Sequence, residues 1–95
     1  MKLKIFKIYQ DVNIGYDTFD SAIVCAKNEK EAREINPSGW YKFYDKSWWK
    51  QYDDGMKKEE KDETWVHPLE VKAIYLGEAD DSVEEGVILA SFNAG

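Results

Sequence analysis

The chain has 95 residues, which suffices for one hydrophobic core but not for two, so we expect a single domain spanning residues 1–95. Hydrophobic residues make up 43% of the sequence and aromatic residues 15%, which predicts a folded rather than a disordered chain. The formal net charge of −6 argues against direct nucleic-acid binding, because affinity for the phosphate backbone comes from lysine and arginine displacing counterions. A partner with a basic surface suits this charge better.

The first strand and the second strand are predicted to be neighbours. Residues 2–10 are dominated by β-favouring side chains and have no helix cap before them, so they predict a strand. Residues 11–18 carry the Asn, Asp and Gly of a turn. Residues 19–26 are continuously apolar, as expected of a central strand. Cys25, the only cysteine, lies in this run and is expected to be a buried structural thiol rather than a nucleophile.

One short helix is predicted at about residues 28–36. Asn28 can cap it by accepting a hydrogen bond from a free backbone N–H, and Glu31 occupies the third helical position. Pro37 and Gly39 then end the helix. The helix is expected to turn Ala32 and Ile35 toward the core.

The middle of the chain predicts a hairpin followed by a loop. Residues 40–52 suit two short strands joined by a turn at residues 45–47. Residues 53–64 are rich in charge, and Met56 is their one large apolar residue. This composition indicates a solvated loop or a frayed helix.

Two further strands are predicted near the end of the sequence. Residues 67–70 turn the chain, residues 71–76 read as a strand, and residues 86–92 form an apolar run that predicts a buried strand. The expected fold is α+β, with one mainly antiparallel mixed sheet of about five or six strands and one main short helix.

No set of residues in the sequence has the spacing of a catalytic or metal site. His67 stands beside Pro68 without a second ligand or nucleophile nearby, and no nucleophile-elbow sequence surrounds any serine. The segment from Asp11 to Asp17 begins like a calcium loop, but its spacing fails after Asn13 and Asx turns explain it better. We therefore expect no catalytic residues, no metal, no cofactor and no enzymatic activity.

Aromatic side chains are concentrated in residues 40–52 beyond what one face of a hairpin needs. Strand alternation predicts that Tyr41, Phe43 and one tryptophan face inward. Trp40, Tyr44 and the other tryptophan, Trp48 or Trp49, then face outward, where such residues anchor interfaces. The alternative is that all of them pack in the core.

Acidic residues form two blocks. Residues 59–63 mix glutamate and aspartate with lysine, whereas Asp80, Asp81, Glu84 and Glu85 have no lysine among them and create the stronger local field. The second block is either a solvated loop or a surface that imitates nucleic-acid phosphates toward a basic partner.

Several segments resemble a family of small accessory proteins of phages and prophages of low-GC Gram-positive bacteria. The likeness rests on the opening strand and on residues 13–26, 29–33, 77–80 and 86–95, the last reading GVILASFNAG. Residues 40–65 look like the variable part of this family, which has no established activity. The resemblance implies a protein that acts in the cytoplasm of an infected bacterial host and neutralises a host defence by stoichiometric binding. The sequence shows no basic-then-apolar leader, and no apolar run approaches the roughly 20 residues of a membrane span. Both observations agree with the expected cytoplasmic location.

The leading hypothesis is therefore a non-enzymatic inhibitor of a bacterial defence nuclease or its complex, such as a CRISPR effector. The expected partner-binding residues are Trp40, Tyr44, Trp48, Trp49, Asp80, Asp81, Glu84 and Glu85. One alternative is a small-molecule sponge that holds a nucleotide signal between aromatic rings, with Lys42, Lys46 or Lys50 meeting its phosphates. Another is a structural or regulatory homodimer, formed by the aromatic hairpin or by a free sheet edge.

Overall fold

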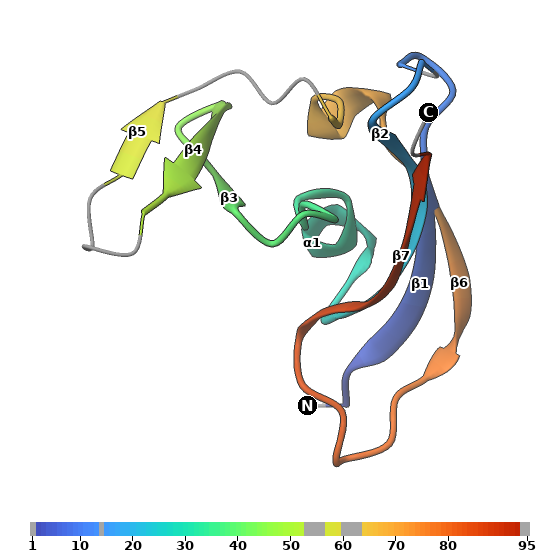
Figure 1. Cartoon of the computed structure of the whole chain (residues 1–95). Coiled ribbons are helices and arrows are strands. Elements are labelled where there is room, and N and C mark those ends of the chain that lie inside the picture. The colour runs from blue at the N-terminus through green and yellow to red at the C-terminus, as the bar shows by residue number, and fades with distance from the viewer. Residues whose placement is uncertain (1, 14, 53–56, 60–63, 94–95) are drawn as a thin grey trace.

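A computed structural model describes residues 2–13, 15–52, 57–59 and 64–93 (Figure 1). Within these ranges the chain forms a four-stranded sheet, a three-stranded sheet and one α-helix. All strand pairs are antiparallel, and the predicted α+β class is confirmed. The strands are divided between two sheets, however, where the sequence predicted a single one.

The larger sheet has the strand order β6-β1-β2-β7. Its strands are β1 (Lys4–Tyr9), β2 (Thr18–Ala26), β6 (Lys72–Glu78) and β7 (Gly86–Asn93). The two strands predicted at the start of the chain are therefore the two central ones. Phe6 and Ile8 of β1 and Val24 of β2 turn to the same face and are buried there, as strand alternation requires.

The connection between β1 and β2 is closed by the side chain of Gln10. Its Oε1 accepts hydrogen bonds from the backbone N–H groups of Val12 at 2.8 Å and Asn13 at 2.7 Å. Its Nε2 donates to the carbonyl oxygens of Asn13 at 2.6 Å and Phe19 at 2.9 Å. Gln10 is buried, and its amide satisfies turn backbone that would otherwise lack partners.

The helix α1 (Glu29–Arg33) covers the buried face of the larger sheet (Figure 1). The predicted cap is confirmed, because Asn28 Oδ1 accepts a hydrogen bond from the N–H of Glu31 at 2.9 Å. The helix is shorter than the predicted 28–36, since Ile35 already forms an isolated β-bridge with Lys42. Ala32 is fully buried against the sheet.

The smaller sheet has the order β3-β4-β5, with β3 (Tyr41–Tyr44), β4 (Ser47–Gln51) and β5 (Lys57–Glu59). The predicted hairpin is confirmed. Asp45 and Lys46 connect its strands with positive φ angles of 49° and 64°, as in the type I′ turns that suit two-residue hairpins. The predicted loop at 53–64 is wrong for residues 57–59, which pair with β4, while residues 53–56 and 60–63 lie outside the described part of the chain.

The core lies between the larger sheet, α1 and the aromatic residues that the smaller sheet and the segment 64–71 contribute. Its buried members include Phe6, Ile8, Ala22, Val24, Ala32, Trp48, Trp65, Val66 and Val71. Before β6 the chain makes a short 3-10 helix η1 (Pro68–Glu70), which His67 caps by accepting a hydrogen bond from the N–H of Leu69 at 3.1 Å. The predicted turn there is confirmed.

Cys25 is buried as predicted. Burial raises the pKa of its thiol, and the nearby charge of Glu85 raises this pKa further. The thiol is therefore kept in its less reactive protonated form.

The prediction that residues 86–92 form a buried strand is wrong. They form β7 at one edge of the larger sheet, and among the described strands β7 pairs with β2 alone. Val87, Ile88, Leu89 and Phe92 are all exposed to solvent. An apolar run suits a central strand or an edge strand equally, and strand order decides between them.

Candidate functional site

The hairpin of β3 and β4 sorts its aromatic side chains between the core and the solvent. Trp48 is only 7% exposed, its ring meets Phe43 edge to face at 5.4 Å, and its Nε1 donates to the carbonyl of Val66 at 3.1 Å. Trp48 is therefore a core residue, and its expected place on an exposed partner-binding surface is corrected. Tyr41 and Phe43 lie on the same inward side, as predicted.

Tyr44 and Trp49 lie on the opposite, outward side of this sheet. Tyr44 is 72% exposed and Trp49 is half-buried. The indole Nε1 of Trp49 donates to the carbonyl oxygen of Tyr44 at 2.8 Å, and the two rings stand edge to face at 6.3 Å. The hydrogen bond orients the Trp49 ring against the hairpin backbone, and the Tyr44 ring lies beside it.

Lysines flank this aromatic pair. Lys42 lies directly opposite Trp49 in the strand register, and Lys57 of β5 lies opposite Gln51, two residues along the same face. We call the surface formed by Lys42, Tyr44, Trp49 and Lys57 the aromatic–lysine face. Glu59 borders it and is held by a hydrogen bond of 2.8 Å from Ser47 Oγ.

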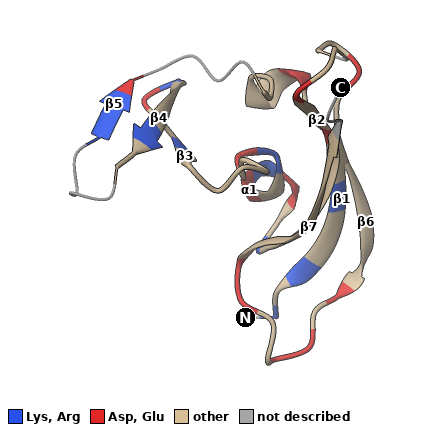
Figure 2. Ribbon diagram, in the orientation of Figure 1, with Lys and Arg blue, Asp and Glu red and all other residues tan. Residues whose placement is uncertain are grey.

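The local charge of the smaller sheet is opposite to the net charge of the protein. Its described strands and hairpin turn carry lysines at 42, 46, 50, 57 and 58, against acidic residues at 45 and 59. Figure 2 shows this basic colouring on β4 and β5. Asp53, Asp54, Glu60, Asp62 and Glu63 adjoin β5 in the sequence but lie outside the described residues, so this positive balance is that of the described strands and turn alone.

The acidic block of Asp80, Asp81, Glu84 and Glu85 lies in the connection between β6 and β7, and all four residues are exposed. Asp80 Oδ1 accepts a hydrogen bond from the N–H of Ser82 at 2.9 Å, which lowers the pKa of this carboxyl group. Asp81 lies 3.7 Å from the ammonium of Lys2, and Glu85 lies 4.0 Å from that of Lys27. The block is therefore partly neutralised.

The structure does not bring the acidic block and the aromatic–lysine face together. The acidic connection follows Glu78, which pairs with Lys4 at the beginning of β1. The smaller sheet instead meets the other end of the larger sheet, where Trp48 bonds to Val66 and Phe43 contacts His67 at 5.2 Å, shortly before β6 begins. Figure 1 shows the two regions at opposite ends of the molecule, so they are two surfaces rather than one.

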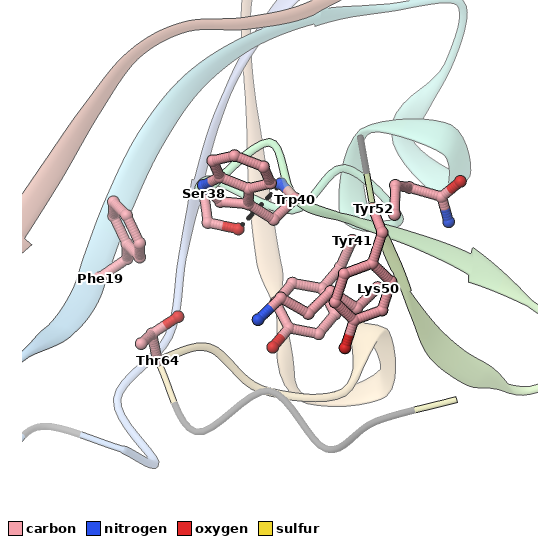
Figure 3. Close-up of a pocket in the computed structure, with 8 residues that line it drawn as sticks. Phe19, Ser38, Trp40, Tyr41, Lys50, Tyr52 and Thr64 are labelled. Atoms are coloured by element: carbon pink, nitrogen blue, oxygen red, sulfur yellow. Dashed lines mark hydrogen bonds between the residues drawn. The ribbon is translucent and has the colours of Figure 1, made fainter. Parts of the chain in front are cut away.

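A cavity of about 550 Å³ opens beside β3 and β4 (Figure 3). Its lining residues come from both sheets and from the segments that connect them: Phe19, Ser38, Trp40, Tyr41, Lys50, Gln51, Tyr52 and Thr64. Lys50 is the one charged residue among these eight. The cavity thus combines aromatic walls with a single cation, a composition that suits planar anionic ligands.

Trp40 belongs to this cavity and is 54% exposed. Its backbone is fixed at both ends, since its N–H donates to Ser38 Oγ at 3.2 Å and its carbonyl accepts from the N–H of Gln51 at 2.8 Å. In Figure 3 the polar ends of Tyr41, Lys50 and Tyr52 lie on one side of the cavity, facing Thr64. The Lys50 ammonium lies 5.6 Å from the centre of the Tyr52 ring.

Other features narrow the chemistry of the described residues. Within the described ranges, no three His, Cys, Asp or Glu side chains gather in a way that could hold a metal ion. No helix in that part of the chain has the length and apolar character needed to cross a bilayer. No protein-family model, curated protein or solved structure matches the sequence or the fold.

Proposed function

We propose that this chain is a non-enzymatic, phage-encoded binding protein that inhibits a bacterial defence complex by stoichiometric contact. The observation that carries the proposal is the pair of exposed Tyr44 and half-buried Trp49 on the aromatic–lysine face. Phage origin and the defence target rest on the resemblance of the two ends of the sequence to small phage proteins.

The aromatic–lysine face has the properties of an interface anchor. Tyrosine and tryptophan dominate binding energy at protein interfaces because they bury a large area at a small cost in side-chain entropy. The hydrogen bond from Trp49 Nε1 to the backbone carbonyl of Tyr44 restricts the indole ring before binding, which reduces that cost further. Partner contact on this face is therefore favoured by preorganisation.

The charges predict which partner surface each region fits. The aromatic–lysine face suits a partner patch that contains carboxylates, with Lys42 and Lys57 as flanking cations. The exposed Asp80, Asp81 and Glu84 suit a basic patch, such as the nucleic-acid channel of a nuclease. Because these regions lie at opposite ends of the molecule, we assign the primary contact to the aromatic–lysine face.

The proposal is tested with hosts that carry one defined defence nuclease complex. Expression of the protein should restore phage plating on such a host, and the purified complex should bind the protein at a fixed molar ratio. Tyr44→Ala should raise the Kd of the complex by about 30-fold or more and reduce plating, since truncating an interface tyrosine costs about 2 kcal/mol or more. Tyr16→Ala in the connection between β1 and β2, another exposed tyrosine, is the matched control and should leave binding unchanged. Unaltered plating across a panel of such hosts would refute the defence target.

A second function is favoured by the cavity. Its aromatic walls and Lys50 fit the ring and phosphate of a nucleotide signal, which the protein would sequester as a sponge. Ligand present at 100 times its Kd stabilises a folded protein by about 2.7 kcal/mol, so a thermal-shift panel of cyclic nucleotides and ADP-ribose derivatives detects binding.

Matched lysine variants locate the ligand in this panel. Lys50→Gln should remove the thermal shift, whereas Lys42→Gln, on the other side of the sheet, should retain it. Absence of a shift with every compound tested contradicts the sponge function.

A further inference from the structure

The free edge of β7 differs from the edges that proteins usually leave in water. An edge strand presents unpaired backbone N–H and C=O groups, which form a template for another strand. Such edges are normally blocked by charged residues, by proline or by a covering segment. The strand Gly86–Asn93 contains no charged residue and no proline. Val87, Ile88, Leu89 and Phe92 are solvent-exposed, and Leu89 reaches 67% exposure, whereas Ala90 packs against the core.

The opposite edge of the same sheet, β6, is better protected. It begins at Lys72, whose ammonium lies 3.0 Å from the Asp11 carboxylate, and it ends at Glu78. A register shift between Ile5 and Phe6 leaves Leu76 without a partner in β1, which bends this edge. The pairing of β7 with β2 also shifts register twice, at Ile88 and between Phe19 and Ser21 of β2, but the run Leu89–Ser91 between these shifts is paired regularly. A regular, uncharged template therefore remains.

We propose that two copies of this chain pair through β7, antiparallel and about a two-fold axis, so that their larger sheets become one continuous sheet. A second copy fits this edge because the strand is complementary to itself when reversed. Antiparallel pairing brings the start of β7 in one copy, with Glu84 and Glu85, to the Asn93 end of the other. The two acidic blocks are thereby kept apart, whereas parallel pairing would place them side by side.

Edge pairing is favoured over packing of two sheet faces. The outward face of the larger sheet does carry apolar residues, among them Ile74 and Leu89. However, Lys7 projects from the middle of that face, opposite Ile23 and Ile74 in the register. Face-to-face packing about a two-fold axis would bury the Lys7 ammonium of both copies without a counter-charge, which is costly. Pairing through β7 leaves Lys7 in water.

The test measures association of the purified full chain over a range of concentrations by sedimentation equilibrium. The expected species has twice the 11.1 kDa mass of the chain. Leu89→Lys should raise the dimer Kd by at least about tenfold, because it places a charge on the paired edge. Leu76→Lys is the matched control, since Leu76 is 54% exposed on the opposite edge and should leave the Kd unchanged. Circular dichroism confirms that each variant is folded.

Hydrogen exchange at low and high concentration separates β7 pairing from other modes of association. Those amides of residues 89–93 that point away from β2 should gain protection as the dimer forms, while the amides of β6 should not. Association should also strengthen as salt rises, because each copy carries a net charge of −6. A chain that stays monomeric at millimolar concentration, a dimer that gains protection at β6, or a dimer indifferent to Leu89→Lys would each overturn the proposal.

Discussion

The two sheets of this molecule are stabilised and exposed in different ways. The larger sheet buries one face under α1 and the aromatic core, and its central strands carry Ile8 and Val24 with no exposed surface. The smaller sheet is joined to that core by a few anchors, chiefly Trp48 and Phe43, and turns lysines and aromatic rings to the solvent. The comparison shows that stability resides mainly in one sheet and the proposed binding surface in the other.

Replacing Trp48 should cause the largest loss of stability, and the loss should fall mainly on the smaller sheet. Trp48→Ala removes the buried anchor and its hydrogen bond to Val66, and truncation of a buried tryptophan costs about 3–5 kcal/mol. Amides of β3 and β4 should lose hydrogen-exchange protection before those of β1 and β2. Tyr44→Ala, at an exposed site of the same hairpin, should change the free energy of unfolding by less than about 0.5 kcal/mol. Simultaneous loss of protection in both sheets would show that they unfold as one unit.

Gln10 tests the larger sheet in the same way. Gln10→Ala removes four hydrogen bonds that close the turn between β1 and β2, and we expect a loss of about 2 kcal/mol in the free energy of unfolding, measured in urea. Gln10→Glu keeps the acceptor for the N–H of Val12 but not the donor to Phe19. Its free energy of unfolding should therefore lie between that of the original protein and that of Gln10→Ala. A loss of hydrogen-exchange protection confined to β3 and β4 would contradict the assignment of Gln10 to the stability of the larger sheet.

The helix between the sheets should contribute less. Asn28→Ala removes the cap of α1 and should cost about 1 kcal/mol in thermal or urea unfolding. Asn28→Asp retains an oxygen acceptor for the N–H of Glu31 and should be close to the original protein. Equal destabilisation by both substitutions would mean that the cap hydrogen bond is not the cause.

The smallest effect is expected at the surface ion pair of Lys72 and Asp11. The hydrogen bond and charge of Asp11 raise the pKa of Lys72 above its ordinary value of 10.5. A raised pKa in the folded state stabilises the protein below the unfolded pKa and ceases to do so as the pH rises through the folded value. The stability difference between the original protein and Lys72→Gln should therefore be constant near neutral pH and vanish in strong alkali. A difference that grows with pH would contradict this sign.

Local patterns account for the elements that sequence predicted well. The cap at Asn28, the turn after Tyr44 and the apolar run of β2 are each determined by residues close together in the chain. β5 was missed because Lys57–Glu59 has no apolar pattern and is held by backbone pairing with β4. The edge position of β7 was missed because strand order is a long-range property.

The candidate site was predictable only in part. The sequence identified the aromatic hairpin, but a shift of one residue in register exchanges Trp48 with Trp49, so it could not assign one to the core and one to the surface. The distance between the acidic block and the hairpin depends on how the larger sheet is connected. Phe19 and Lys50 line the same cavity although they are far apart in the sequence, and no local sequence pattern indicates that they lie close together.

The lone thiol of Cys25 supplies a built-in reporter of motion in the larger sheet. Cys25 pairs with Gly86 of β7, and it is inaccessible to solvent. A thiol-modifying reagent can therefore react only when the structure around Cys25 opens, and its labelling rate measures the frequency of that opening. If two copies pair through β7, labelling will slow as the protein concentration rises. The labelling rate of one cysteine will then report both local opening and dimer formation.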